Sequence, residues 1–188
     1  MAANCYLVDD SIIDPGDDAE YILSHLKIPP SRIIATHGHF DHIMAAYALQ
    51  LSFNIPFLMH KDDAFLVGKM QQSARHFLNI TPDPPPNITA YIHDGDKIAG
   101  LTVLHTPGHT PGSISLYSQK NSVVFSGDTI FAEGAVGRTD HEYSNAAALS
   151  RSIKKILTYP SKTKLLSGHG AETIIRQELR FHRSYPIV

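Results

Sequence analysis

The sequence predicts a mixed fold in which short strands alternate with helices. Four short apolar runs, most of them rich in β-branched residues, each end in a loop bearing glycine or histidine, which is typical of strands that deliver side chains to one sheet edge. These runs are residues 32–36, 101–105, 122–126 and 164–167. Segments with helical spacing lie between them, at residues 17–26, 43–53 and 144–157. The first opens with acidic residues, which favour a helix N-terminus.

Length and composition predict one globular domain over residues 1–188. The chain is 43% hydrophobic and 18% charged, and its net charge of -2 provides no positive field for nucleic acid. No apolar run approaches the roughly 20 residues of a membrane span, and the N-terminus MAANCYLVDD lacks signal-peptide features. We therefore expect a cytoplasmic protein that binds neither nucleic acid nor membrane, with its oligomeric state left open.

The proline-rich segment TPDPPPN, residues 81–87, suits neither a helix nor a strand. We expect a stiff surface loop there, and it is a candidate border of a substrate cleft.

A single cysteine and twelve histidines direct any metal chemistry towards nitrogen and oxygen ligands. One cysteine excludes an internal disulfide framework and a thiolate-rich zinc cluster. Cys5 itself lies in the apolar run of residues 5–8, which favours a buried strand thiol without a functional role.

The motif HGHFDH supplies possible metal ligands at His37, His39, Asp41 and His42, directly after a predicted strand. An alternative for Asp41 is the N-cap of a helix that starts at Ile43. One ion cannot easily use all four side chains. Imidazole together with carboxylate suits zinc, iron or manganese, so the motif indicates two transition-type ions.

Three further candidates follow the later predicted strands. His109 lies in TPGHTPG, Asp128 in SGDT and His169 in SGHG. An ordinary turn histidine and an ordinary turn aspartate are the competing interpretations. His105 is interpreted as a strand-end residue, because Pro107 turns the chain before His109.

The candidates can be divided between two ions. One ion would take His37, His39 and His109, and the other Asp41, His42 and His169, with Asp128 as the bridge because a carboxylate has two oxygens.

The ordered set HGHFDH, TPGHT, SGDT and SGHG resembles the metallo-β-lactamase superfamily from Asn4 onward. The resemblance implies an α+β fold, the four-layer αββα sandwich, in which relatives usually have one further strand before NCYLV. The segments GDTIF and GRTD resemble the glyoxalase II-like (hydroxyacylglutathione hydrolase-like) branch. The lack of cysteine at position 128 disfavours β-lactamases of the cysteine-ligand type. Full-length glyoxalase II enzymes add a helical domain that binds glutathione, whereas 19 residues follow His169, so glutathione selectivity is not predicted.

The resemblance implies hydrolysis of small thioesters or esters such as S-lactoylglutathione by a hydroxide held on two divalent metals. Zinc is the favoured metal, with iron or manganese as alternatives. Asp41 is a candidate for orienting the nucleophile or accepting its proton, with a purely coordinating role as the alternative. Arg138 is the candidate for a substrate carboxylate, with a structural bond to Asp140 as the alternative. Rival functions are a persulfide dioxygenase with one iron, which resembles the same motifs, and a non-enzymatic metal-binding module.

Overall fold

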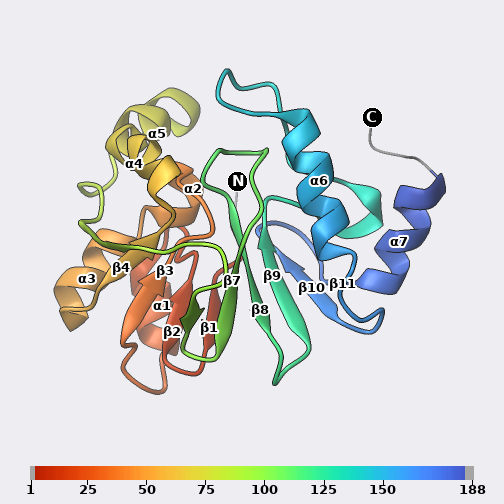
Figure 1. The fold of residues 1–188 in the computed structure, drawn as a ribbon. Coiled ribbons are helices and arrows are strands. Elements are labelled where there is room, and N and C mark those ends of the chain that lie inside the picture. Colours follow the sequence, from red (N-terminus) through yellow and green to blue (C-terminus); the bar gives the residue numbers. More distant parts are fainter. Residues whose placement is uncertain (1–2, 185–188) are drawn as a thin grey trace. The chain divides into compact units, whose positions relative to one another are not determined.

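The computed structural model describes residues 3–184, and the chain divides into two compact units, Met1–Ile92 and His93–Val188. Each unit contains one sheet and its own helices (Figure 1). The predicted single domain stays a prediction, which an unfolding experiment can test.

Within the described residues, the first unit carries a five-stranded sheet in the order β1-β2-β3-β4-β5. Its strands are β1 (Tyr6–Val8), β2 (Ser11–Ile13), β3 (Arg32–Ile34), β4 (Phe57–Met59) and β5 (Ile88–Tyr91). The β1–β2 pair is antiparallel and the later pairs are parallel. Because β2 and β3 are parallel with Ile13 opposite Ile34, the residues that follow them emerge at the same edge.

Short helices of the first unit bury apolar side chains against its sheet. They are α1 (Ala19–His25), α2 (Phe40–Ile43), α3 (Ala46–Phe53), η1 (Lys61–Asp63, a 3₁₀ turn), α4 (Ala64–Gly68) and α5 (Met70–Leu78). The core joins Ile33 and Phe57 of the sheet to Ile43, Leu49 and Met70 of the helices. This packing fixes α2, which contains part of the HGHFDH motif, against the sheet.

The second unit carries a six-stranded sheet among the described residues, in the order β11-β10-β9-β8-β7-β6. Its strands are β6 (Lys97–Ile98), β7 (Leu101–His105), β8 (Ile114–Ser118), β9 (Val123–Gly127), β10 (Lys164–Ser167) and β11 (Thr173–Ile174). The β9–β10 pair is parallel and the other pairs are antiparallel. Asp128 and His169 follow the parallel pair, so they emerge at the same edge.

The helical segments of the second unit are η2 (Ala132–Gly134, a 3₁₀ turn), α6 (Ala146–Ile156) and α7 (Ile175–Ser184). Leu149 and Ile153 of α6 pack with Val124 of β9, Leu165 of β10 and Ile175 at the start of α7. In Figure 1, α6 and α7 lie beside the strands of this unit.

The predicted elements agree with the structure to within a few residues. The strand predictions for residues 101–105 and 164–167 match β7 and β10, and Asp18 caps α1 by accepting a hydrogen bond from Tyr21 N at 2.8 Å. Residues 81–87 form an irregular loop, as predicted.

Two local expectations differ from the structure. The helix predicted from residue 43 is split into α2 and α3, and α2 begins at Phe40 with His39 as its N-cap, so the N-cap alternative for Asp41 is wrong. The expectation of a buried Cys5 is also wrong, because the residue precedes β1 and is exposed.

Among the helices of residues 3–184, none combines the length and apolar character needed to cross a lipid bilayer.

Candidate metal centre

The HGHFDH motif forms a largely buried turn between β3 and α2 in the first unit. His37, Asp41 and His42 are 1%, 8% and 0% exposed, and His39 is half-buried. Burying several imidazoles and a carboxylate in one turn is costly unless each polar atom has a partner. The partners of these rings therefore indicate what the turn is built to do.

Asp14, which follows β2, fixes the orientation of two of these histidines. His42 donates from Nδ1 to Asp14 Oδ2 at 3.1 Å, and Thr36 donates its hydroxyl to the same carboxylate at 2.6 Å. Since that hydroxyl proton is used, His37 Nδ1, 3.1 Å from Thr36 Oγ1, is the donor there. In both rings Nε2 is therefore the nitrogen that could bind a metal ion. Such support of histidines by a carboxylate is typical of metal sites.

The spacing of the ligand atoms in this turn fits a metal ion. Nε2 of His37 and Nδ1 of His39 lie 3.1 Å apart. Two nitrogens bound to one zinc-like ion at about 2.0–2.1 Å are roughly 2.9–3.4 Å apart for ligand angles of about 90–109°.

Gly38 and Asp63 fix the backbone of the same turn. The amide of Gly38 donates to the carboxylate of Asp63 at 2.9 Å, and Asp63 is 0% exposed. A Cβ on Gly38 would lie 2.8 Å from Leu66 Cβ and 2.9 Å from Asp63 O. The small residue between the two histidines is therefore required by the close approach of η1 and α4.

In the second unit, one oxygen of Asp128 faces two histidines. Oδ2 of Asp128 lies 3.7 Å from His109 Nε2 and 3.5 Å from His169 Nε2. These separations are slightly longer than the distance between two ligands of one ion. The donor set of imidazole nitrogen and carboxylate oxygen suits a first-row transition metal.

His109 is held by the loops around it. Its Nδ1 donates to the backbone oxygen of Arg138 at 2.8 Å, which leaves Nε2 directed at Asp128. Ser144 Oγ donates to His109 O at 2.7 Å, and the amide of Asn145 donates to Gly108 O at 2.8 Å. The start of α6 therefore anchors the TPGH loop.

Gly137 explains why the GRTD segment begins with glycine. A Cβ there would overlap Asp128 O and approach His109 Cβ at 3.0 Å. The segment can place the Arg138 carbonyl beside His109 only because position 137 has no side chain.

The side chain of Arg138 forms a bidentate ion pair with Asp140, at 2.7 Å from Nε and 2.6 Å from Nη2. The side chains are 57% and 62% exposed. These hydrogen bonds from Arg138 hold the pKa of Asp140 well below its usual range. The bond to Asp140 is the structural alternative noted from the sequence, and a substrate contact stays a prediction.

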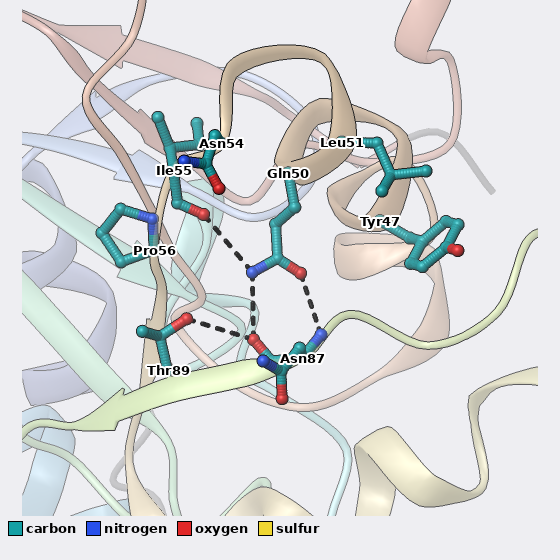
Figure 2. A pocket seen from close by; sticks show the side chains of 8 residues that line it. All are labelled: Tyr47, Gln50, Leu51, Asn54, Ile55, Pro56, Asn87 and Thr89. Carbon is teal, nitrogen blue, oxygen red and sulfur yellow. Dashed lines mark hydrogen bonds between the residues drawn. The ribbon is translucent and has the colours of Figure 1, made fainter.

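A separate pocket of about 410 Å³ in the first unit lies between α3 and the start of β5 (Figure 2). Asn87, the last residue of the predicted proline-rich loop, lines it. The side-chain amide of Gln50 forms two hydrogen bonds with the backbone of Asn87. It donates to Asn87 O at 3.0 Å and accepts from Asn87 N at 2.8 Å. Gln50 thereby links α3 to the residue that precedes β5. The pocket lining includes none of the predicted metal ligands.

The structure brings the predicted ligands together within each unit. Sequence reasoning missed Asp14, Asp63 and Gly137. Asp14 carried a usable signal, because it follows an apolar run and precedes Pro15-Gly16, as the other candidates follow theirs. Asp63 and Gly137 carried no such signal, because their roles depend on contacts with residues distant in sequence.

Mixed sheets with helices, and buried groups of imidazoles and carboxylates, define a metal-binding α/β protein. Residues 1–169 match the family model described as the metallo-β-lactamase superfamily. The chain belongs to that superfamily.

Individual relatives agree with this assignment. Hydroxyacylglutathione hydrolase GloC of Haemophilus influenzae is 34% identical over 94% of this chain and 90% of its own. The crystal structure of TTHA1623 in a di-iron-bound form is 34% identical with a TM-score of 0.90, covering 95% of this chain and 93% of its own. That of BLEG-1, a B3 metallo-β-lactamase, is 37% identical with a TM-score of 0.82, covering 95% and 90%. The predicted metallo-β-lactamase fold is confirmed.

Proposed function

We propose that this chain is a metal-dependent thioester hydrolase of the glyoxalase II type, acting on S-lactoylglutathione or similar small thioesters. Two divalent ions, with zinc favoured over iron or manganese, are assigned to the predicted residues. These are His37, His39, Asp41, His42, His109, Asp128 and His169.

The position of Asp128 is the observation that carries the proposal. A single carboxylate oxygen that faces Nε2 of both His109 and His169 is suited to contact two cations and reduce their mutual repulsion. The rings of His37 and His42 are held with Nε2 as the ligand atom. A turn histidine and a turn aspartate with no common purpose would need no such arrangement.

A bound divalent ion of this type lowers the pKa of water to about 7 and polarises a carbonyl oxygen. Other residues of the chain would orient the histidines, the nucleophile and the substrate. Asp14 and Thr36 maintain the tautomers of His37 and His42, and the Arg138 carbonyl maintains that of His109. Asp41 is assigned to orient the nucleophile or take up its proton. The guanidinium of Arg138 is assigned to a substrate carboxylate.

The choice of thioesters is supported by similarity to the hydrolase GloC, and by chemistry, because a thiolate leaves more easily than an alkoxide. The test is elemental analysis of the purified protein together with hydrolysis of S-lactoylglutathione and a simple thioester. We expect about two metals per chain and turnover of one or both substrates. Turnover that survives complete metal removal would contradict the proposal.

β-Lactam hydrolysis is the second candidate, because the chain is 37% identical to the BLEG-1 β-lactamase. Nitrocefin in the same assay separates the two candidates, since efficient lactam cleavage without thioester cleavage would favour the β-lactamase over the thioester hydrolase.

A dioxygenase would be identified by a different result: one iron per chain, oxygen consumption on glutathione persulfide and no thioester turnover.

A further inference from the structure

The carboxylate of Glu178 on α7 is completely buried and holds the loop between β9 and the GRTD segment. Glu178 is 0% exposed. It accepts hydrogen bonds from the amides of Glu133 at 3.2 Å and Gly134 at 2.7 Å, and from the hydroxyl of Thr173 at 2.7 Å. Burying a carboxylate is costly, so these donors must compensate for lost water.

The loop that is hydrogen-bonded to Glu178 has positive φ angles at Glu133 and Gly134, the two residues that form its tip. Glu133 has φ 62° and Gly134 has φ 77°, and in this turn the amides of both residues point at the carboxylate of Glu178. Glutamate pays a steric penalty in this region. A Cβ on Gly134 would lie 2.9 Å from Phe181 Cβ, so α7 also contacts the tip directly. The conformation of the tip therefore depends on α7.

A short hairpin connects this tip to His109. Phe131 N donates to Ala135 O at 2.9 Å, and Ile130 pairs with Val136 as an antiparallel bridge. Gly137 follows at once and packs against the Asp128 carbonyl. The next carbonyl, that of Arg138, accepts the hydrogen bond from His109 Nδ1.

We infer that Glu178 is a positioning residue that acts on His109 through the hairpin of residues 130–136. By fixing this hairpin it places the Arg138 carbonyl, which sets the tautomer and the orientation of the His109 ring. Glu178 touches neither Asp128 nor His109 in the contacts described for it. Its effect on metal binding rests on the proposed function, whereas its effect on the ring of His109 does not.

The central variant is Glu178→Gln, which keeps the size of the side chain. Its NH₂ group would face a backbone amide, placing donor against donor where the carboxylate accepts. The matched control is Glu172→Gln, because Glu172 is 58% exposed and pairs with Lys164 at 3.0 Å. Thr173→Val is a milder variant that removes one hydrogen bond from Glu178 and leaves both backbone amides bound.

The experiment has two readouts on the full chain. Nitrogen–proton correlation spectra of the metal-free protein report which nitrogen of His109 carries the proton, and Co²⁺ titration reports metal affinity. We expect wild type and Glu172→Gln to show the Nδ1–H form. Glu178→Gln should lose that pattern and bind Co²⁺ about 10-fold more weakly, as expected when support for a ligand is removed. Thr173→Val should shift both readouts in the same direction by less.

A folded Glu178→Gln protein with wild-type tautomer and Co²⁺ affinity would overturn the inference. If Glu178→Gln does not fold, an unchanged His109 spectrum in Thr173→Val would overturn it. If wild type binds no Co²⁺, the proposed function fails, while the tautomer comparison still decides the role of Glu178.

Discussion

His42 and Asp14 form a fully buried pair, with Nδ1 of the histidine 3.1 Å from Oδ2 of the aspartate. The pair joins the end of β2 to α2, and Thr36 at the end of β3 bonds to the same carboxylate through its amide at 2.7 Å and its hydroxyl. The parallel pairing of β2 and β3 places these groups together. Asp14 thus acts on the proposed metal centre without being one of the predicted ligands.

Replacing Asp14 by asparagine should weaken metal binding by about 10- to 100-fold, because His42 loses the carboxylate that orients it. The amide oxygen of asparagine can still accept from Thr36 N, which limits the damage to folding. Metal titration of the refolded apoprotein measures the effect. Asp10→Asn, at a 40% exposed side chain that pairs with Arg32, is the control. Equal affinities in the two variants would refute the assigned role.

Replacing Asp128 by alanine should reduce the metal content from about two ions per chain towards one. Turnover of the thioester should fall by on the order of 100-fold or more, since a direct ligand should matter at least as much as an outer partner. Elemental analysis and steady-state kinetics give both values, with exposed Asp83→Ala as the control. Full metal content with full turnover would rule out the bridged arrangement.

Gly137→Ala should destabilise the fold by about 1–3 kcal/mol, because the new methyl group overlaps the Asp128 carbonyl and crowds His109. Gly68→Ala is the contrasting change. Gly68 ends α4, and a Cβ there meets nothing within 4 Å, so that variant should be stabilised by up to about 1 kcal/mol. Urea unfolding compares the two. Similar effects of both changes would mean that the loop at Gly137 relaxes freely.

Arg138→Ala should raise KM about 10-fold for a substrate with a carboxylate and leave kcat unchanged, because the lost contact is charge-assisted. The free energy of unfolding should change by less than about 1 kcal/mol, since the pair with Asp140 is exposed. Asp140→Ala removes the partner but keeps the guanidinium, so its KM should not rise. An unchanged KM in Arg138→Ala with a clear loss of stability would favour the structural alternative.

The two compact units should unfold together if residues 1–188 form one domain. Native-state hydrogen exchange can compare the amides of Ile33 in the first unit and Val124 in the second, both of which are fully buried. We expect both to exchange with the same free energy of opening and the same urea dependence. Clearly different values would mean that the units are separate cooperative domains.

The local pattern of the sequence was sufficient for the strand ends, whereas the metal ligands that it names stay a prediction. A short apolar run that stops at a loop bearing glycine or histidine is typical of a strand end, and β7 and β10 begin and end where this pattern predicts. The helix predicted from residue 43 was less well placed. Its first turn begins inside the motif at Phe40, because the packing of α2 against the core overrides the local preference.

The pairing of the strands decides which polar side chains lie side by side, and the local sequence pattern does not predict this. Which carboxylate orients which imidazole depends on the segments that become neighbours, and that information lies in contacts distant along the chain. Asp14 reaches His42 across 28 residues, His109 reaches the Arg138 carbonyl across 29, and Glu178 reaches Gly134 across 44. The sequence by itself determined the family and the chemical types of the candidate ligands. Only the tertiary structure decided how each ring is held, because a hydrogen bond depends on position and angle rather than on residue type.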